Sequence, residues 1–237
     1  MDNLGVRLAV DATAPLPGLD QVSYFNNSTM MEVDFLPEHL IVVGGSYVGL
    51  EFAQMYRRFG SEVTIVEMGP RLIQRDDEDV AEAIRTILEN EGINMRLNAE
   101  CIAMENRGKK VAISVDCSSG DKTVVGSHVL LAVGRVPNTE DLGLENAGVA
   151  VDQRGYIQVD DELRTNVLGI YALGDCNGRG AFTHTSYNDY EIVAANLLDG
   201  DQRRVSDRIT AYALYIDPPL GRAGMTETGC ESQGEKH

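Results

Sequence analysis

Short apolar runs alternate with amphipathic stretches through the first half of the chain, a pattern typical of a parallel sheet covered by helices. Residues 40–43 (Leu-Ile-Val-Val) form an apolar, largely β-branched run and predict a strand buried on both faces. Over residues 46–59 apolar side chains recur at steps of three and four, which predicts a helix that ends at Gly60. The face of this helix expected to be buried consists of Val48, Phe52, Met55, Tyr56 and Phe59.

The same alternation continues toward the middle of the chain. Residues 61–66 and 93–97 predict two further strands, with an amphipathic helix between them at residues 79–90. Three alternating segments separated by turn residues then predict an antiparallel meander: residues 101–105, 110–115 and 122–125. Residues 128–133 are apolar again and should rejoin the parallel sheet. Together these elements predict an α/β fold with a Rossmann-like domain, a parallel sheet plus an antiparallel meander, over residues 36–150.

A glycine-rich turn joins the first predicted strand to the first helix. Gly44, Ser46 and Gly49 occupy the three glycine places of the G-x-G-x-x-G fingerprint. These places serve a tight turn, close approach to a pyrophosphate, and close packing of helix on strand. The middle place is serine, whose side chain can point away while its backbone N–H still faces a phosphate. The predicted pyrophosphate site is the whole turn: Gly44, Gly45, Ser46, Tyr47, Val48 and Gly49.

An acidic residue follows the turn at the distance that the fingerprint expects. Glu67 ends the second predicted strand, where a carboxylate accepts hydrogen bonds from a ribose 2′-OH and repels a 2′-phosphate. NAD(H) is therefore predicted in preference to NADP(H). Arg71 and Arg75 lie just beyond and could serve a 2′-phosphate if the loop folded back. The alternative is a βαβ unit whose glycines serve packing alone.

Charge and composition narrow the classes of partner. The chain of 237 residues has a formal net charge of −17, which argues against nucleic acid and anionic membrane surfaces. No apolar run approaches the roughly 20 residues of a membrane span. The N-terminus lacks a signal-peptide pattern, so we expect a soluble, cytoplasmic protein.

No metal site is expected from the sequence. The four cysteines lack both the C-x-x-C spacing and the usual metal-ligand spacings: Cys101, Cys117, Cys176 and Cys230. The acidic run at residues 76–79 could suggest a cation site, but it begins a predicted helix, where negative charge suits the dipole.

Three separated motifs point to a known family. They are GGSYVGLEF at residues 44–52, AVGRVPNT at residues 132–139 and TNVLGIYALGD at residues 165–175. In this order they resemble the pyridine nucleotide-disulfide oxidoreductases, flavoenzymes that include glutathione reductase, dihydrolipoamide dehydrogenase and mercuric reductase. The mercuric-reductase-like branch is the most similar, and the resemblance covers residues 15–227. It implies an oxidoreductase that passes hydride from NAD(P)H to FAD and on to a disulfide, a metal ion or another acceptor.

The resemblance also implies roles for residues of the second half. Asp175 follows Gly174 at the end of a strand expected over residues 170–173. In the family, the corresponding Asp hydrogen-bonds the ribityl chain of the flavin, and the resemblance implies the same role for Asp175. A helix expected at residues 186–198 would direct its N-terminus at the flavin. His184 stands where related dehydrogenases carry a flavin-side histidine, and a structural histidine is the equal alternative.

Three further residues have roles implied by the resemblance. Glu51 matches a family glutamate near the nicotinamide, which normally pairs with a lysine from the N-terminal flavin half. Gly134 and Arg135 fit the segment that passes the nicotinamide and the flavin pyrophosphate. Arg135 could instead simply anchor the inter-domain loop.

The resemblance implies a division into four segments. Residues 1–35 would be a remnant of the first FAD segment, with residues 11–14 in place of an Ala-Thr-Gly-type turn. Residues 36–150 would be the NAD(P)-binding domain, and residues 151–208 the second FAD segment. Residues 209–237 would start the interface domain, with its first strand within residues 212–227.

Other family features are not recognisable in the sequence. These are the glycine-rich FAD turn, the redox-active cysteine pair, and the catalytic His and Glu of the interface domain, so no catalytic residue is predicted here. We therefore expect weak or absent FAD binding, and exposed apolar edges that favour either a homodimer or local disorder. The alternative to an enzyme is a nucleotide-binding module without turnover.

Overall fold

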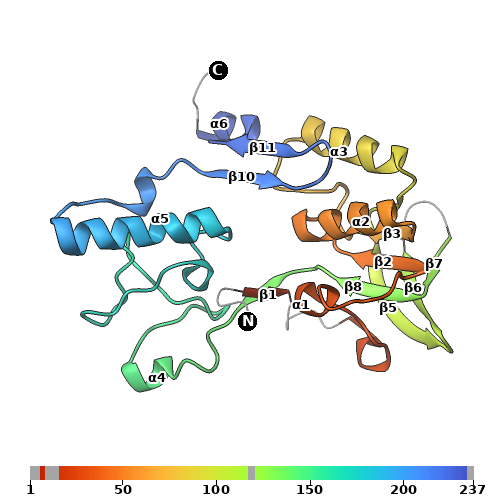
Figure 1. Ribbon diagram of the computed structural model, residues 1–237, viewed down its shortest axis with the longest axis horizontal. Coiled ribbons are helices and arrows are strands. Elements are labelled where there is room, and N and C mark those ends of the chain that lie inside the picture. Colours follow the sequence, from red (N-terminus) through yellow and green to blue (C-terminus); the bar gives the residue numbers. More distant parts are fainter. Residues whose placement is uncertain (1–5, 9–15, 117–120, 234–237) are drawn as a thin grey trace. The chain divides into compact units, whose positions relative to one another are not determined.

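The computed structural model describes residues 6–8, 16–116 and 121–233 (Figure 1). The chain divides into two compact units. The first, here the sheet unit, comprises Leu8–Gly134 and Ala213–His237, and the second, here the loop unit, comprises Met1–Arg7 and Arg135–Tyr212.

A four-stranded parallel sheet forms the centre of the sheet unit. Its order is β4-β3-β2-β8, with β2 at His39–Val43, β3 at Glu62–Val66, β4 at Asn94–Arg96 and β8 at His128–Leu131. Strand β2 pairs with β3 on one side and with β8 on the other, parallel in both cases. The side chains of residues 40–43 are fully buried, which confirms the predicted strand buried on both faces.

Alternate residues of β2 face two different layers. Leu40 and Val42 belong to a core that includes residues of α2 (Tyr47–Phe59) and α3 (Glu78–Asn90). Ile41 and Val43 pack instead with residues of the antiparallel meander. The meander consists of β5 at Glu100–Arg107, β6 at Lys110–Asp116 and β7 at Thr123–Gly126, in the order β5-β6-β7. The predicted parallel sheet with an antiparallel meander is therefore confirmed.

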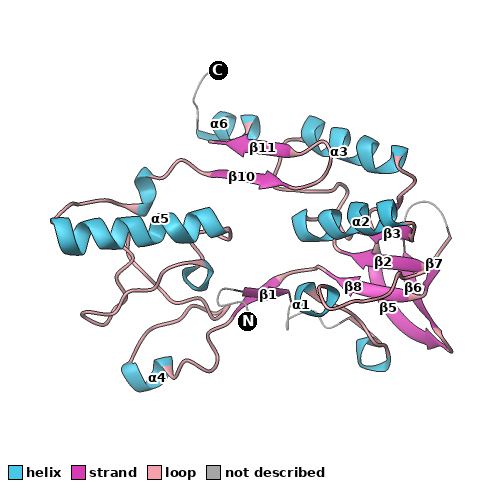
Figure 2. Cartoon of the chain, in the orientation of Figure 1, coloured by secondary structure: helices cyan, strands magenta, loops and turns pink. Residues whose placement is uncertain are grey.

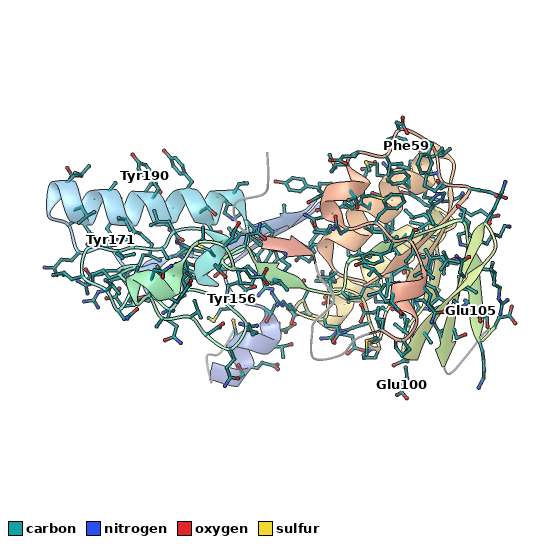
Figure 3. The ribbon with its side chains drawn as sticks, turned by 90° about the horizontal axis from the view of Figure 1, so that it is seen from below. Phe59, Glu100, Glu105, Tyr156, Tyr171 and Tyr190 are labelled. Atoms are coloured by element: carbon teal, nitrogen blue, oxygen red, sulfur yellow. The ribbon has the colours of Figure 1, made fainter. Side chains whose placement is uncertain are left out.

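The buried face of α2 differs from the expected one. Met55 is 37% exposed and Phe59 is 63% exposed (Figure 3), although both were expected to be inward. Gly49 and Ala53 are buried instead, together with Leu50, Gln54 and Tyr56. The physical reason is the close approach of the helix to the sheet, which favours its smallest residues at the contact. Periodicity alone selected large apolar residues: the prediction was wrong for Met55 and Phe59, but it was confirmed for Tyr56, and Phe52 packs half-buried against the same core.

The C-terminal segment packs against α2. It forms a hairpin of β10 (Ala211–Leu214) and β11 (Leu220–Ala223), followed by α6 (Glu227–Gln233). One strand was expected here, and the structure has two that pair with each other. Leu214 and Ile216 are buried in the core that contains α2.

The N-terminal segment also packs in the sheet unit. It contains a 3₁₀ turn at Leu19–Gln21 and α1 at Asn27–Met30. Phe25 forms a parallel bridge with Leu130 of β8, and Met30 is buried in the α2 core. The boundary between the compact units follows Gly134, and the expected division into four segments stays a prediction. The turn expected at residues 11–14 lies outside the described residues.

The loop unit has little regular structure (Figure 2). Strand β1 (Val6–Leu8) pairs with β9 (Arg135–Pro137), and α4 spans Leu144–Ala147. A 3₁₀ turn at Asp175–Asn177 precedes α5 (Thr183–Ala194), a π turn at Ala195–Asp199 and a 3₁₀ turn at Val205–Asp207. Helix α5 therefore starts three residues earlier than expected.

The strand expected at residues 170–173 does not form. Among the described residues, this segment makes a single bridge, from Tyr171 to Arg164 (Tyr171 is labelled in Figure 3). A strand needs a paired neighbour along its length, and this segment has one bridge only. The prediction of a strand was therefore wrong for the described chain.

Apolar side chains of the loop unit lie at the surface. Its two buried clusters are small, with Val149, Ile157 and Ala172 in one and Leu163, Ile192 and Val193 in the other. Among its described residues, eight large apolar or aromatic side chains are exposed: Leu142, Val151, Leu168, Tyr187, Tyr190, Leu197, Leu198 and Ile209. The expected exposure of apolar surface is thus present, and the homodimer stays a prediction. Within the described ranges, no helix has the length and apolar character needed to cross a membrane.

Candidate functional site

The glycine turn, residues 44–49, depends on backbone contacts too close for side chains. Gly44 has a φ of 114°, and a Cβ there would lie 2.4 Å from the carbonyl oxygen of Ala132. A Cβ on Gly49 would lie 2.3 Å from the carbonyl oxygen of Gly44. Ser46 is the exposed N-cap of α2, so the first N–H groups of the helix start at Tyr47. The first and third glycine places therefore meet the geometric demands from which they were predicted.

Glu67 lies directly against the glycine turn. Its Oε2 accepts a hydrogen bond of 2.6 Å from the N–H of Gly45. Its Oε1 accepts bonds of 2.7 Å from the N–H of Gly69 and 3.1 Å from Nε2 of Gln74. Glu67, predicted to bind the ribose, is thus hydrogen-bonded directly to the predicted pyrophosphate turn, although Gly45 and Glu67 are 22 residues apart in sequence.

The covering loop, residues 69–77, packs on the same turn. The N–H of Ile73 donates to the carbonyl of Gly45 at 2.9 Å, and Leu72 occupies the space that a Cβ of Gly45 would need. Ile73 has a φ of 36°, an unusual conformation for a β-branched residue. The guanidinium of Arg71 donates to the carbonyl oxygens of Gln74 and Asp76, both at 3.3 Å. Arg71 is therefore bonded within its own loop.

Tyr47 begins α2 and leads to a residue that sequence reasoning missed. Its hydroxyl donates to Oδ2 of Asp76 at 3.0 Å. Asp76 is buried and also accepts a bond of 3.2 Å from Nη1 of Arg222. Its neighbour Asp77 is the N-cap residue of α3, so the start of the helix in this acidic run is confirmed. The acidic run was the only sequence signal for Asp76, and it suggested no bond to Tyr47.

The turn, the start of α2 and Glu67 have the arrangement that a dinucleotide-binding βαβ unit requires. The glycines at both ends of the turn leave room only for backbone, so a ligand can approach the start of α2 closely. That helix start presents the positive end of the helix dipole to an anion. Glu67 adds acceptor oxygens beside Gly45 for a sugar hydroxyl.

Glu51 and Gly134 also lie in the sheet unit. Glu51 is on α2, and its Oε1 accepts a bond of 2.9 Å from the N–H of Tyr215. The C-terminal segment thus contacts the glutamate for which the resemblance implied a lysine partner. The boundary between the two compact units falls directly after Gly134.

The loop unit contains the second group of predicted residues. Gly174 has a φ of 81° and a ψ of −163°, a conformation open essentially to glycine alone, and it places Asp175 at the start of a 3₁₀ turn. Burial raises the pKa of Asp175 above its ordinary value, and the positive charge of Arg135 opposes that rise. Ser186 of α5 donates weakly to Asp175 at 3.4 Å. Arg135 also donates to the carbonyl of Ala181 at 3.2 Å, as an anchoring residue would.

A buried carboxylate beneath this turn was not predicted. Asp189 of α5 is 1% exposed. Its Oδ2 accepts bonds from the N–H of Gly174 at 2.8 Å and from Nδ2 of Asn177 at 2.9 Å. Its Oδ1 pairs with the guanidinium of Arg208, whose side chain is 10% exposed. Asp189 therefore fixes the backbone from which Asp175 projects. An acidic residue inside a helix gave no sequence signal of this contact.

His184 is an exposed residue of the first turn of α5. Its Nε2 lies 2.5 Å from the carbonyl oxygen of Ala211, and its ring stacks on Phe182 at 5.4 Å. Phe182 stacks in turn on Tyr212 at 5.3 Å. These contacts favour the structural alternative for His184.

Comparison with known proteins places these sites in a family. A model described as pyridine nucleotide-disulphide oxidoreductase matches residues 9–189, which is more than half of the chain. The chain belongs to this family. The family match includes both the glycine turn and the segment with Gly174 and Asp175, so the resemblance stated from the three motifs is confirmed.

Individual members of the family are similar over nearly the whole chain. The probable pyridine nucleotide-disulfide oxidoreductase RclA of Escherichia coli is 38% identical over 234 residues, 98% of this chain and 52% of its own length. A mercuric reductase of Streptomyces lividans is 36% identical over 95% of this chain and 48% of its own length. The chain therefore spans about half the length of the curated relatives that it matches.

A solved structure of a family member supports the fold. The HOCl-induced flavoprotein disulfide reductase RclA from Escherichia coli superposes with a TM-score of 0.87 at 36% sequence identity. The match covers 98% of this chain and 52% of that one. In the part of this chain that the structure describes, no three His, Cys, Asp or Glu side chains gather as a metal site requires.

Proposed function

We propose that the chain binds NADH at the glycine turn and forms the nicotinamide side of a flavin-dependent oxidoreductase. The observation that carries this proposal is the pair of bonds from Gly45 and Gly69 to the carboxylate of Glu67. They hold the acid beside the turn, where ribose and pyrophosphate of one dinucleotide would meet. The start of α2 would bind the pyrophosphate, and Glu67 would accept bonds from the adenosine ribose.

Two residues of the loop unit, Asp175 and Arg135, have proposed roles in binding the flavin. Asp175 would accept a hydrogen bond from the flavin's sugar-alcohol chain, and Arg135 would contribute positive charge near it. The flavin, when bound, supplies the hydride-accepting chemistry, while protein residues bind and orient the two cofactors. The final acceptor, a disulfide, a metal ion or another oxidant, stays open. We expect this chain to retain FAD weakly or not at all.

A second candidate is a nucleotide-binding module without turnover. The small apolar clusters of the loop unit favour it, because they give Asp175 little surrounding structure with which to hold a large cofactor. In this case NADH binds but is not oxidised.

One experiment separates the two candidates. NADH binding is measured by calorimetry, and NADH oxidation is then followed with an artificial electron acceptor, with and without added FAD. Flavin-dependent oxidation supports the oxidoreductase, and binding without oxidation supports the module. Absence of NADH binding would contradict both. The visible absorbance of the purified protein tests flavin retention, and a stoichiometric yellow complex would overturn the expected weak binding.

Preference for NADH over NADPH is proposed to depend on Glu67. In Glu67→Gln we expect NADH affinity to fall about tenfold, as loss of a charge-assisted hydrogen bond predicts. NADPH affinity should change less, because the substitution also removes repulsion of the 2′-phosphate. Calorimetric titration with both nucleotides measures the ratio.

Arg71→Gln is the matched control for nucleotide preference. Arg71 is bonded to backbone carbonyls of its own loop, so this variant should keep the wild-type preference. If Arg71→Gln weakened NADPH binding selectively, the arginine and not Glu67 would set the preference.

A further inference from the structure

The C-terminal hairpin contacts the covering loop, residues 69–77, through a largely buried ion pair. Arg222 of β11 donates through Nη1 to Oδ1 of Asp76 at 3.2 Å and to the carbonyl of Arg75 at 3.2 Å. The side chain of Asp76 is 4% exposed and that of Arg222 is 21% exposed. Removing one partner of a pair this well covered leaves the other charge buried and uncompensated.

The same carboxylate holds the first residue of α2. Oδ2 of Asp76 accepts the hydroxyl proton of Tyr47, which directly follows the N-cap Ser46. The N–H of Asp76 donates to the carbonyl of Ile73, whose own N–H donates to Gly45. The side chain of Asp76 is therefore hydrogen-bonded directly to Tyr47. Its backbone is linked to Gly45 indirectly, through Ile73.

We infer that Asp76 and Arg222 are positioning residues for the nucleotide turn, and that the hairpin containing Arg222 is part of that site. The inference rests on the proposed function, NADH binding at residues 44–49. Arg222 neutralises the buried carboxylate of Asp76, and Asp76 holds Tyr47 and the covering loop in place. The first N–H groups of α2 are thereby aimed at the pyrophosphate without a direct contact from Asp76 or Arg222. Positioning groups of this kind support the residues that touch the ligand.

A second contact of the same hairpin provides the control. Nη1 of Arg58 and Oδ2 of Asp217 form an exposed ion pair of 2.8 Å between the hairpin and the C-terminal half of α2. It involves the same hairpin but joins it to α2, far along the helix from the glycine turn. Asp217→Asn therefore weakens hairpin docking without touching the Tyr47 contact.

The experiment measures NADH affinity of the full chain by calorimetry. Tyr47→Phe removes the hydroxyl alone and should weaken NADH binding about threefold to tenfold, the effect of one buried hydrogen bond. Asp76→Ala should weaken it by about tenfold or more, as a hydrogen bond to a charged group predicts. The double variant should bind as Asp76→Ala does, since the hydroxyl has then already lost its acceptor. Asp217→Asn should stay within about twofold of the wild type, as an exposed pair predicts.

Arg222→Lys tests rescue. Lysine keeps the positive charge beside Asp76, so it should restore most of the affinity that Arg222→Met loses. Additive effects of Tyr47→Phe and Asp76→Ala, or an equal loss in Asp217→Asn, would overturn the inference while leaving the proposed function intact. Failure of the wild-type chain to bind NADH would overturn the proposed function itself.

Discussion

Replacing Gly49 by alanine is expected to lower NADH affinity by about 100-fold or more, because backbone, and not a flexible side chain, blocks the new methyl group. The added Cβ would lie 2.3 Å from the carbonyl oxygen of Gly44 and 3.3 Å from Cγ1 of Val42. Gly44 cannot move aside freely, since it packs against the backbone of Ala132: a Cβ on Gly44 would lie only 2.4 Å from that carbonyl oxygen. Helix α2 must therefore shift, and its N–H groups lose their aim at the pyrophosphate.

The same substitution should destabilise the sheet unit. Overpacking of this kind costs about 1–3 kcal/mol of the free energy of unfolding. Urea unfolding followed by circular dichroism measures that cost, and calorimetry measures NADH affinity under conditions where the variant is folded.

Gly221→Ala is the matched control for this change. It adds the same methyl group in the same unit, at a position with no atom within 4 Å of the new Cβ, so affinity and stability should be unchanged. Wild-type NADH affinity in Gly49→Ala would show that the turn is a packing feature and not a nucleotide site.

Replacing Asp189 by alanine is the second large expected effect, in this case on the loop unit. The change should cost about 3–5 kcal/mol of the free energy of unfolding, because it leaves the guanidinium of Arg208 buried and unpaired. It also removes the acceptor for the N–H of Gly174 and one of the two acceptors of the Asn177 side-chain amide, which still donates to the carbonyl of Ala172. Hydrogen exchange should show faster exchange in α5 and at residues 174–177, which carry Asp175.

Two further variants test the cause of this effect. Asp201→Ala breaks an exposed pair with Arg203 in the same unit, at 3.1 Å, and should cost less than about 1 kcal/mol. Combining Asp189→Ala with Arg208→Leu should recover much of the stability, since no buried charge then stays unpaired. If Asp189→Ala alone were as stable as Asp201→Ala, the buried pair would not hold the turn.

Local pattern was sufficient for most elements of the sheet unit. Residues 40–43 form the buried strand, and α2 ends at Gly60, where the backbone is left-handed. Such features depend on neighbours within a few positions, through side-chain periodicity and the freedom of glycine. The covered strand could be recognised because apolar residues follow one another without alternation.

Local pattern was misleading where distant partners decide the structure. Residues 170–173 have the apolar sequence of a strand. Of these four residues, only Tyr171 forms a β-bridge with another described residue. A strand is stabilised by hydrogen bonds to a neighbouring strand, which its own sequence does not contain. The burial of Met55 and Phe59 was wrongly predicted for a similar reason. Periodicity identifies a stripe of side chains on the helix, but it does not show how closely the helix approaches the sheet.

The sequence by itself determined the class of fold, the family, and the places of the turn glycines and of Glu67. These follow from short spacings in which each residue meets a local backbone requirement. The tertiary structure alone decided which residues support the turns: Tyr47, Asp76 and Arg222 in the sheet unit, and Gly174, Asp189 and Arg208 in the loop unit. Arg222 and Asp76 lie 146 residues apart in sequence. A contact between residues so far apart in sequence forms only when the folded chain brings two elements together. No local sequence pattern can therefore predict it.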